Sequence, residues 1–121
     1  MAMRWAPCRP PRLFHAGRND EPILDVGRMT LAAGEQITFV RPSGAEYDVV
    51  AKDWGFYATP SVNARLLASG MRAALVRSTT SARRFVLLVE NGYEASFNAY
   101  LQSEHMVVEA WLDTTDVEVS R

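Results

Sequence analysis

The segment with the clearest capacity for chemistry runs from Asp53 to Arg65 and combines three aromatic side chains with polar and basic ones. Within it, Thr59 is expected to be the N-cap of a helix and Pro60 the first helical residue. Proline suits that position because its fixed φ is helical and its missing N–H would have no partner there. The free amide groups of a first helical turn favour bound anions. The segment therefore predicts a site for a phosphate, a carboxylate or a sugar derivative.

Six side chains of this segment are predicted to contact the ligand. The polar and basic groups would bind its charge, and the aromatic rings would form the wall of the pocket. The same residues have a second interpretation, in which the rings pack in the core and the threonine only caps the helix. The six candidate ligand-binding residues are Trp54, Tyr57, Thr59, Ser61, Asn63 and Arg65.

Three side chains are the candidates for catalysis: Tyr57, His105 and Glu109. His105 follows a predicted helix, whose negative C-terminal end favours a protonated imidazole. Glu109 lies in a predicted strand close to Trp111, and burial there would raise the pKa of its carboxyl group and make it a candidate acid. The three do not form a recognisable catalytic constellation, so the sequence favours a non-enzymatic function and leaves an enzyme open.

The composition narrows the function classes. The 121 residues carry 13 basic and 14 acidic side chains and a net charge of -1, which argues against a nucleic-acid partner. The one cysteine, Cys8, cannot form a disulfide within the chain, and with two histidines it is too few for a four-ligand zinc site. No apolar run approaches the roughly 18 residues of a membrane span. We expect a soluble, cytoplasmic protein with no metal, no cofactor and no membrane association.

The first part of the chain differs from the rest. Residues 1–22 contain Pro7, Pro10 and Pro11 among four arginines and show neither helical nor strand periodicity. They are predicted to be a disordered tail. An arm that wraps a partner subunit, anchored by Trp5 and Phe14, is the alternative. Residues 23–121 are predicted to form a single α+β domain.

A regular order of elements follows within that domain. Strand-forming runs flank a turn at 41–44, and two segments show the apolar spacing of amphipathic helices. Asn91 and Glu94 have the spacing of a capping box at the start of the second helix. The predicted elements are strands at 36–40 and 46–51, a helix of about ten residues from Pro60, strands at 72–76 and 85–89, a helix after Asn91, and a strand at 106–112.

Counted from Tyr47, this order is βαββαβ, which predicts a ferredoxin-like split βαβ sandwich preceded by an extra N-terminal strand or hairpin. The run Phe85–Val89 is apolar at every position, so we expect it to be a central strand buried on both faces. RNA-recognition motifs share this order, but they present aromatic side chains on the central strands that this chain lacks. A sheet with both helices on one face leaves the other face uncovered, which predicts a homodimer or another protein partner.

These observations lead to one expected function with two alternatives. We expect a small accessory or binding domain that recognises an anionic small molecule at the helix start near Thr59. The first alternative is a small dimeric ferredoxin-like enzyme of the isomerase, lyase or cofactor-free oxygenase type. The second is a protein–protein interaction module that acts through its sheet face.

Overall fold

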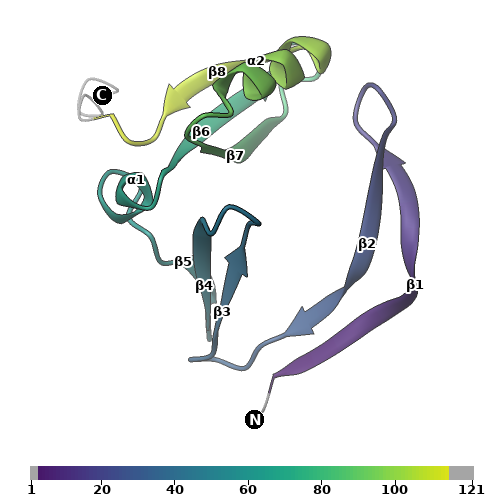
Figure 1. Ribbon diagram of the computed structural model, residues 1–121, viewed down its shortest axis with the longest axis vertical. Helices are drawn as coiled ribbons and strands as arrows, with labels where there is room; N and C mark the ends of the chain where they lie inside the picture. The colour runs from purple at the N-terminus through teal and green to yellow at the C-terminus, as the bar shows by residue number, and fades with distance from the viewer. Residues whose placement is uncertain (1–2, 115–121) are drawn as a thin grey trace. The chain divides into compact units, whose positions relative to one another are not determined.

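The computed structural model describes residues 3–114, in which eight strands form three antiparallel sheets and two short helices accompany them (Figure 1). The chain divides into two compact units. The first contains Met1–Phe39 and Asp48–Thr59, and the second contains Val40–Tyr47 and Pro60–Arg121. Each unit has its own strand pairings and is described separately.

The first unit begins with a two-stranded antiparallel hairpin. Strand β1 (Arg4–Ala16) pairs with strand β2 (Glu21–Thr30), with Arg4 opposite Thr30 and Ala16 opposite Glu21. The register shifts between Pro7 and Arg12, where residues 8–11 lie opposite a single residue of β2. This bulge contains Pro10 and Pro11, so neither proline has to donate an N–H to the ladder. The structure thus forms a strand where the sequence predicts a disordered tail.

No residue of β1 or β2 is fully buried. Gly27 of β2 has a φ of +153°, and a Cβ atom there would lie 2.5 Å from the ring of Trp5. The indole ring therefore lies directly against the glycine backbone. Among the described residues, no third strand is hydrogen-bonded to this hairpin.

The next three strands form a sheet in the order β3–β4–β5. The hairpin predicted for the first two is confirmed, and its turn is closed by a 2.8 Å bond from the N–H of Arg41 to the carbonyl of Ala45. The third strand was not predicted. This strand, β5, pairs with β4, and Lys52 lies opposite Gly55, so Asp53 and Trp54 occupy a tight turn. The bounds are β3 Gln36–Val40, β4 Glu46–Lys52 and β5 Gly55–Ala58.

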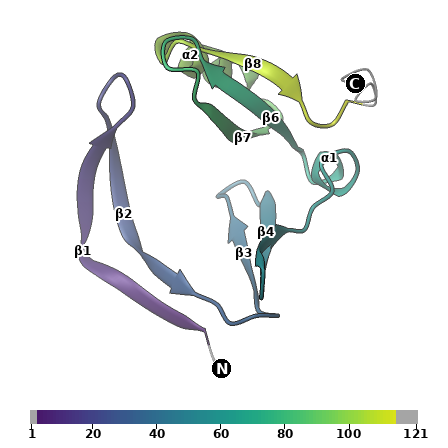
Figure 2. The ribbon, with the colours of Figure 1, turned by 180° about the vertical axis from the view of Figure 1, so that it is seen from behind.

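The second unit is built on an antiparallel sheet in the order β7–β6–β8, with α2 packed against β7 and β8 (Figure 2). Successive residues of a strand point to opposite faces, and Ala73 and Ala74 of β6 are both buried. Each belongs to a separate small core. The first core contains Leu66, Met71 and Ala73, and the second contains Ala74, Val76 and Leu101. The bounds are α1 Arg65–Ala68, β6 Met71–Ser78, β7 Arg84–Glu90, α2 Glu94–Ser103 and β8 Met106–Trp111.

The ferredoxin-like prediction is wrong. That fold needs one sheet that contains all four strands, whereas β4 lies in a different sheet from β6, β7 and β8. The first helix has four residues rather than about ten, which is too short to carry the chain across a sheet between parallel strands. The apolar run in β7 forms an edge strand rather than a central one, and its Val86 is 60% exposed. The unbroken apolar run indicates a strand, but it does not specify which neighbours that strand has.

Candidate functional site

The first unit contains an open apolar groove of about 850 Å³. The β1–β2 hairpin contributes one part of its lining and the β3–β4–β5 sheet contributes the other. The lining consists of aliphatic and aromatic side chains and one glycine, with no ionisable group. The lining residues are Met3, Trp5, Val26, Gly27, Met29, Leu31, Ile37, Phe39, Val49 and Phe56.

Several side chains of this groove are highly exposed for apolar residues. Phe56 of β5 is 72% exposed, and Trp5, Val26 and Phe39 are each close to half exposed. Single exposed apolar residues are normal on protein surfaces, but a contiguous apolar patch marks a surface that another molecule covers. Nearby Trp54 is 70% exposed and does not line the groove, so it provides a natural comparison with Phe56.

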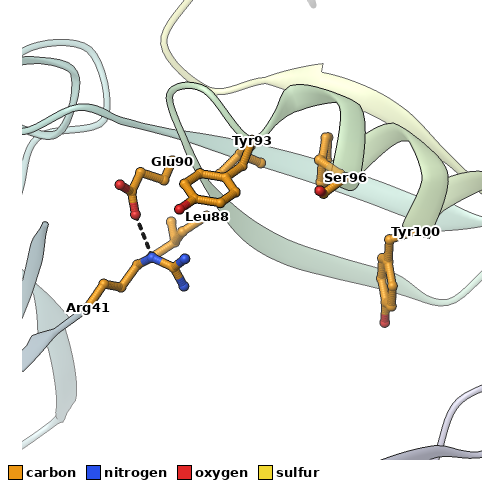
Figure 3. Close-up of a pocket in the computed structure, with 8 residues that line it drawn as sticks. Arg41, Leu88, Glu90, Tyr93, Ser96 and Tyr100 are labelled. Atoms are coloured by element: carbon orange, nitrogen blue, oxygen red, sulfur yellow. Dashed lines mark hydrogen bonds and ion pairs between the residues drawn. The ribbon is translucent and has the colours of Figure 1, made fainter. Parts of the chain in front are cut away.

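A second concave surface lies in the second unit, between β7 and α2 (Figure 3). This cleft has a volume of about 290 Å³ and is lined by aromatic, aliphatic and charged side chains. The lining includes Val89, which is buried, and Phe97, which is half-buried. Tyr93 and Tyr100 both contribute exposed rings from the same side of the helical segment.

The charged end of the cleft is an ion pair between Arg41 and Glu90, in which Nε of the guanidinium group donates to the carboxylate. Hydrogen bonds from Ser43 and Arg41 lower the pKa of the Glu90 carboxyl group, and the same ion pair raises the pKa of Arg41. The guanidinium group also lies 5.5 Å from the centre of the Tyr93 ring, a cation–π contact. Both charges are therefore present at neutral pH, and they compensate each other.

The six predicted ligand-binding residues are divided between the two units. The chain passes from the first unit to the second between Thr59 and Pro60. Trp54, Tyr57 and Thr59 belong to the first unit, and Ser61, Asn63 and Arg65 belong to the second. The predicted anion site stays a prediction.

The local geometry around α1 differs from the expected helix start. The N–H of Thr59 donates to the carbonyl of Asp48 at 3.1 Å, and Pro60 precedes the helix instead of opening it. Ser61 provides the bonds at the helix start. Its hydroxyl accepts the N–H of Arg65 at 2.8 Å, and its carbonyl accepts the N–H of Leu66 at 2.9 Å. These amides are consequently occupied by the chain itself.

The three candidate catalytic residues are also distributed over both units, with Tyr57 in the first and His105 and Glu109 in the second. His105 has a φ of 55°, and its carbonyl accepts hydrogen bonds from the N–H and the hydroxyl of Thr79. Glu109 binds Arg84 through two hydrogen bonds of 2.7 and 3.1 Å. This contact lowers the pKa of the Glu109 carboxyl group, the direction opposite to the one a general acid requires.

Apart from Phe56, which lies in the predicted segment 53–65, the residues that line the groove were not part of the predicted site. The sequence nevertheless carries a signal for some of them, because Ile37 and Phe39 alternate on the predicted strand 36–40, which places both side chains on one face. Trp5 and Val26 line the groove only because β1 pairs with β2, and this pairing is interrupted at the prolines. No local sequence pattern predicts such a pairing.

Within residues 3–114 there is no group of three or more histidine, cysteine, aspartate or glutamate side chains that could hold a metal ion. Neither helix of the described part is long and apolar enough to cross a membrane. Comparison of the chain with family models, curated proteins and solved structures gave no match.

Proposed function

We propose that this protein is an interaction module and that the apolar groove of its first unit associates with a second copy of the chain. The observation that carries the proposal is the groove itself, because about 850 Å³ of open space is lined entirely by aliphatic and aromatic side chains and a glycine. Covering these side chains would gain roughly 25 cal/mol for each Å² of apolar surface removed from water. A partner that supplies apolar side chains therefore fits the groove better than a charged small molecule does.

The β1–β2 hairpin supports the same proposal. An isolated two-stranded hairpin is marginally stable in water, and a third strand or a packed layer is usually needed. The hairpin has exposed apolar residues along both strands, including Leu13 and Leu24. Association would supply the missing layer.

Charge favours a second copy as the partner. Residues 1–30 carry five arginines and three carboxylates, a net charge of +2, whereas the complete chain has a net charge of -1. The remainder of the chain is therefore acidic, and two copies arranged about a two-fold axis can place the basic hairpin of each near acidic surface of the other. The small net charge of the chain also keeps repulsion between copies low.

The experiment that tests the proposal is light scattering coupled to gel filtration on the wild-type chain and two matched variants. Phe56→Ser removes an exposed ring that lines the groove, and Trp54→Ser removes an equally exposed ring that does not. We expect the wild type and Trp54→Ser to be dimeric and Phe56→Ser to be monomeric at the same concentration. A monomeric wild type at high concentration would contradict self-association, and equal dissociation of both variants would place the interface elsewhere.

A further inference from the structure

We propose that the cleft between β7 and α2 binds a neutral, polyhydroxylated ring, the chemistry of a carbohydrate. The proposal is independent of the self-association above, because every residue that lines the cleft belongs to the second unit and every residue that lines the groove belongs to the first. Three features of the cleft support it: its two aromatic surfaces, its compensated charges and its size.

The aromatic surfaces are the rings of Tyr93 and Tyr100, which are 48% and 40% exposed. Tyr93 immediately precedes α2 and Tyr100 lies within it. Tyr100 follows Tyr93 by seven positions, which corresponds to about two helical turns and about 10 Å along the helix axis. This spacing places both rings on the same side of the segment (Figure 3). The C–H face of a sugar ring packs well on an aromatic ring, and this span accommodates two linked sugar rings.

The polar groups at the end of the cleft fit hydroxyl groups better than they fit an anion. The ion pair with Glu90 engages Nε of Arg41, and guanidinium carries further N–H donors on its two Nη atoms. The carboxylate of Glu90 supplies acceptors beside these donors. A hydroxyl group can donate to one and accept from the other, whereas an added phosphate would be repelled by Glu90. Ser96 adds a further hydroxyl to the lining.

The size and lining of the cleft favour a small ligand. Its volume of about 290 Å³ lies just below the usual range for ligand pockets, which is about 300–1,000 Å³. Its apolar lining is limited to Leu88, Val89 and Phe97 beside the tyrosines, in contrast to the entirely apolar groove of the first unit. A ring with one apolar face and several hydroxyl groups matches this mixture.

The test is saturation-transfer NMR on the full chain with three neutral disaccharides as probes: cellobiose, maltose and diacetylchitobiose. We expect transfer from the protein to the ring protons of at least one disaccharide. Tyr93→Phe keeps the ring and should bind within about twofold of the wild type, whereas Tyr93→Ala should bind about tenfold more weakly or not at all. Phe85→Ala is the matched control, because Phe85 is similarly exposed, at 45%, and lies outside the cleft.

Three results would overturn the proposal. The first is the absence of transfer to all three disaccharides at millimolar concentration. The second is binding that Tyr93→Ala leaves unchanged, or that Phe85→Ala weakens equally. The third is displacement of the disaccharide by inorganic phosphate together with tighter phosphate binding by Glu90→Gln, which would identify the cleft as an anion site.

Discussion

The carboxylate of Glu109 forms ion pairs with arginines on two other strands of its sheet. Its carboxylate on β8 binds Arg84 on β7, and Nε of Arg77 on β6 lies 3.5 Å away. Opposite charges in contact favour the ionised form, so the pKa of the carboxyl group is lowered, with the hydrogen bond from Arg84 as the largest cause. At the residue scale, this position is a structural ion-pair site that joins the sheet laterally.

The lowered pKa of Glu109 predicts an acid-dependent loss of stability. A carboxyl group with a lower pKa in the folded state stabilises the fold above its unfolded pKa of about 4.3, and this contribution is lost as the pH falls through the lowered folded value. Glu109→Gln should therefore lower the melting temperature at neutral pH, and the difference from the wild type should shrink on acidification toward about pH 3.

Thermal denaturation monitored by circular dichroism between about pH 7 and about pH 3 measures this difference. Glu46→Gln, an exposed change on β4, serves as the control for a generic loss of negative charge. A difference between wild type and Glu109→Gln that stays constant over this range would contradict the assigned role of the ion pair.

At the scale of elements, α1 shows that residue types can indicate that a helix forms near a position without indicating how long the helix is. Thr59 and Pro60 have the residue types of a helix start, but the helix runs only from Arg65 to Ala68. The hydroxyl of Ser61, which lies before the helix, accepts a hydrogen bond from the N–H of its first residue. A helix this short has no independent stability, so its position is determined by packing. Gly70, with a φ of 92°, then ends the segment before β6 in the left-handed conformation that glycine commonly adopts after a helix.

Leu66 is the residue that packs α1 against β6, and it is fully buried, with 0% exposure. Leu66→Ala should lower the free energy of unfolding by about 2–5 kcal/mol, because it removes buried methyl groups and leaves a cavity next to Met71 and Ala73. Leu67→Ala is the control, since Leu67 is 37% exposed and should cost about 1 kcal/mol or less. Urea denaturation of both variants measures the two values, and equal costs would show that α1 is not anchored by Leu66.

Most of the individual strands and one of the two helices could be predicted from the sequence. The strands at 36–40 and 46–51, the later strands and the helix that includes Glu94 were predicted from alternation and from 3.6-residue periodicity, and the structure confirms them. Pairing was not predictable in this way. The strand 85–89 lies at an edge, and β5 forms from Gly55–Ala58 only because Lys52 and Gly55 pair across a tight turn.

At the scale of the whole molecule, the sequence does not show which apolar surfaces face solvent. The sequence contains enough apolar residues for a core, yet among the described residues only eight hydrophobic ones are buried. Burial depends on contacts between distant segments, as in the pairing of Pro7 with Gly27 and of Arg12 with Asp25 around the proline bulge. The groove could not be predicted because four of its ten lining residues come from that hairpin. The predicted site at 53–65, by contrast, was inferred from local signals alone.

If the groove is covered by a second copy, the stability of the molecule should depend on its concentration. Mass action stabilises a dimer as concentration rises, by about 1.4 kcal/mol for each tenfold increase. The melting temperature of the wild type should therefore rise by several degrees between about 5 and about 500 µM. Differential scanning calorimetry measures this shift, and Phe56→Ser should abolish it. A melting temperature independent of concentration in the wild type would indicate that folding is not coupled to association.

The edge position of β7 has a consequence for the fate of the newly made or partly unfolded chain. Phe85–Val89 is a five-residue window with strong β propensity, no charge and no proline, and one side of its backbone has no strand partner in the sheet. Segments of this kind template fibrillar aggregation. Here Arg83 and Arg84 precede the window and Glu90 follows it, so charges flank both ends. Such gatekeeper residues oppose the stacking of identical strands, so the charges of Arg84 and Glu90, beside forming ion pairs in the folded chain, are expected to oppose aggregation when the chain is partly unfolded.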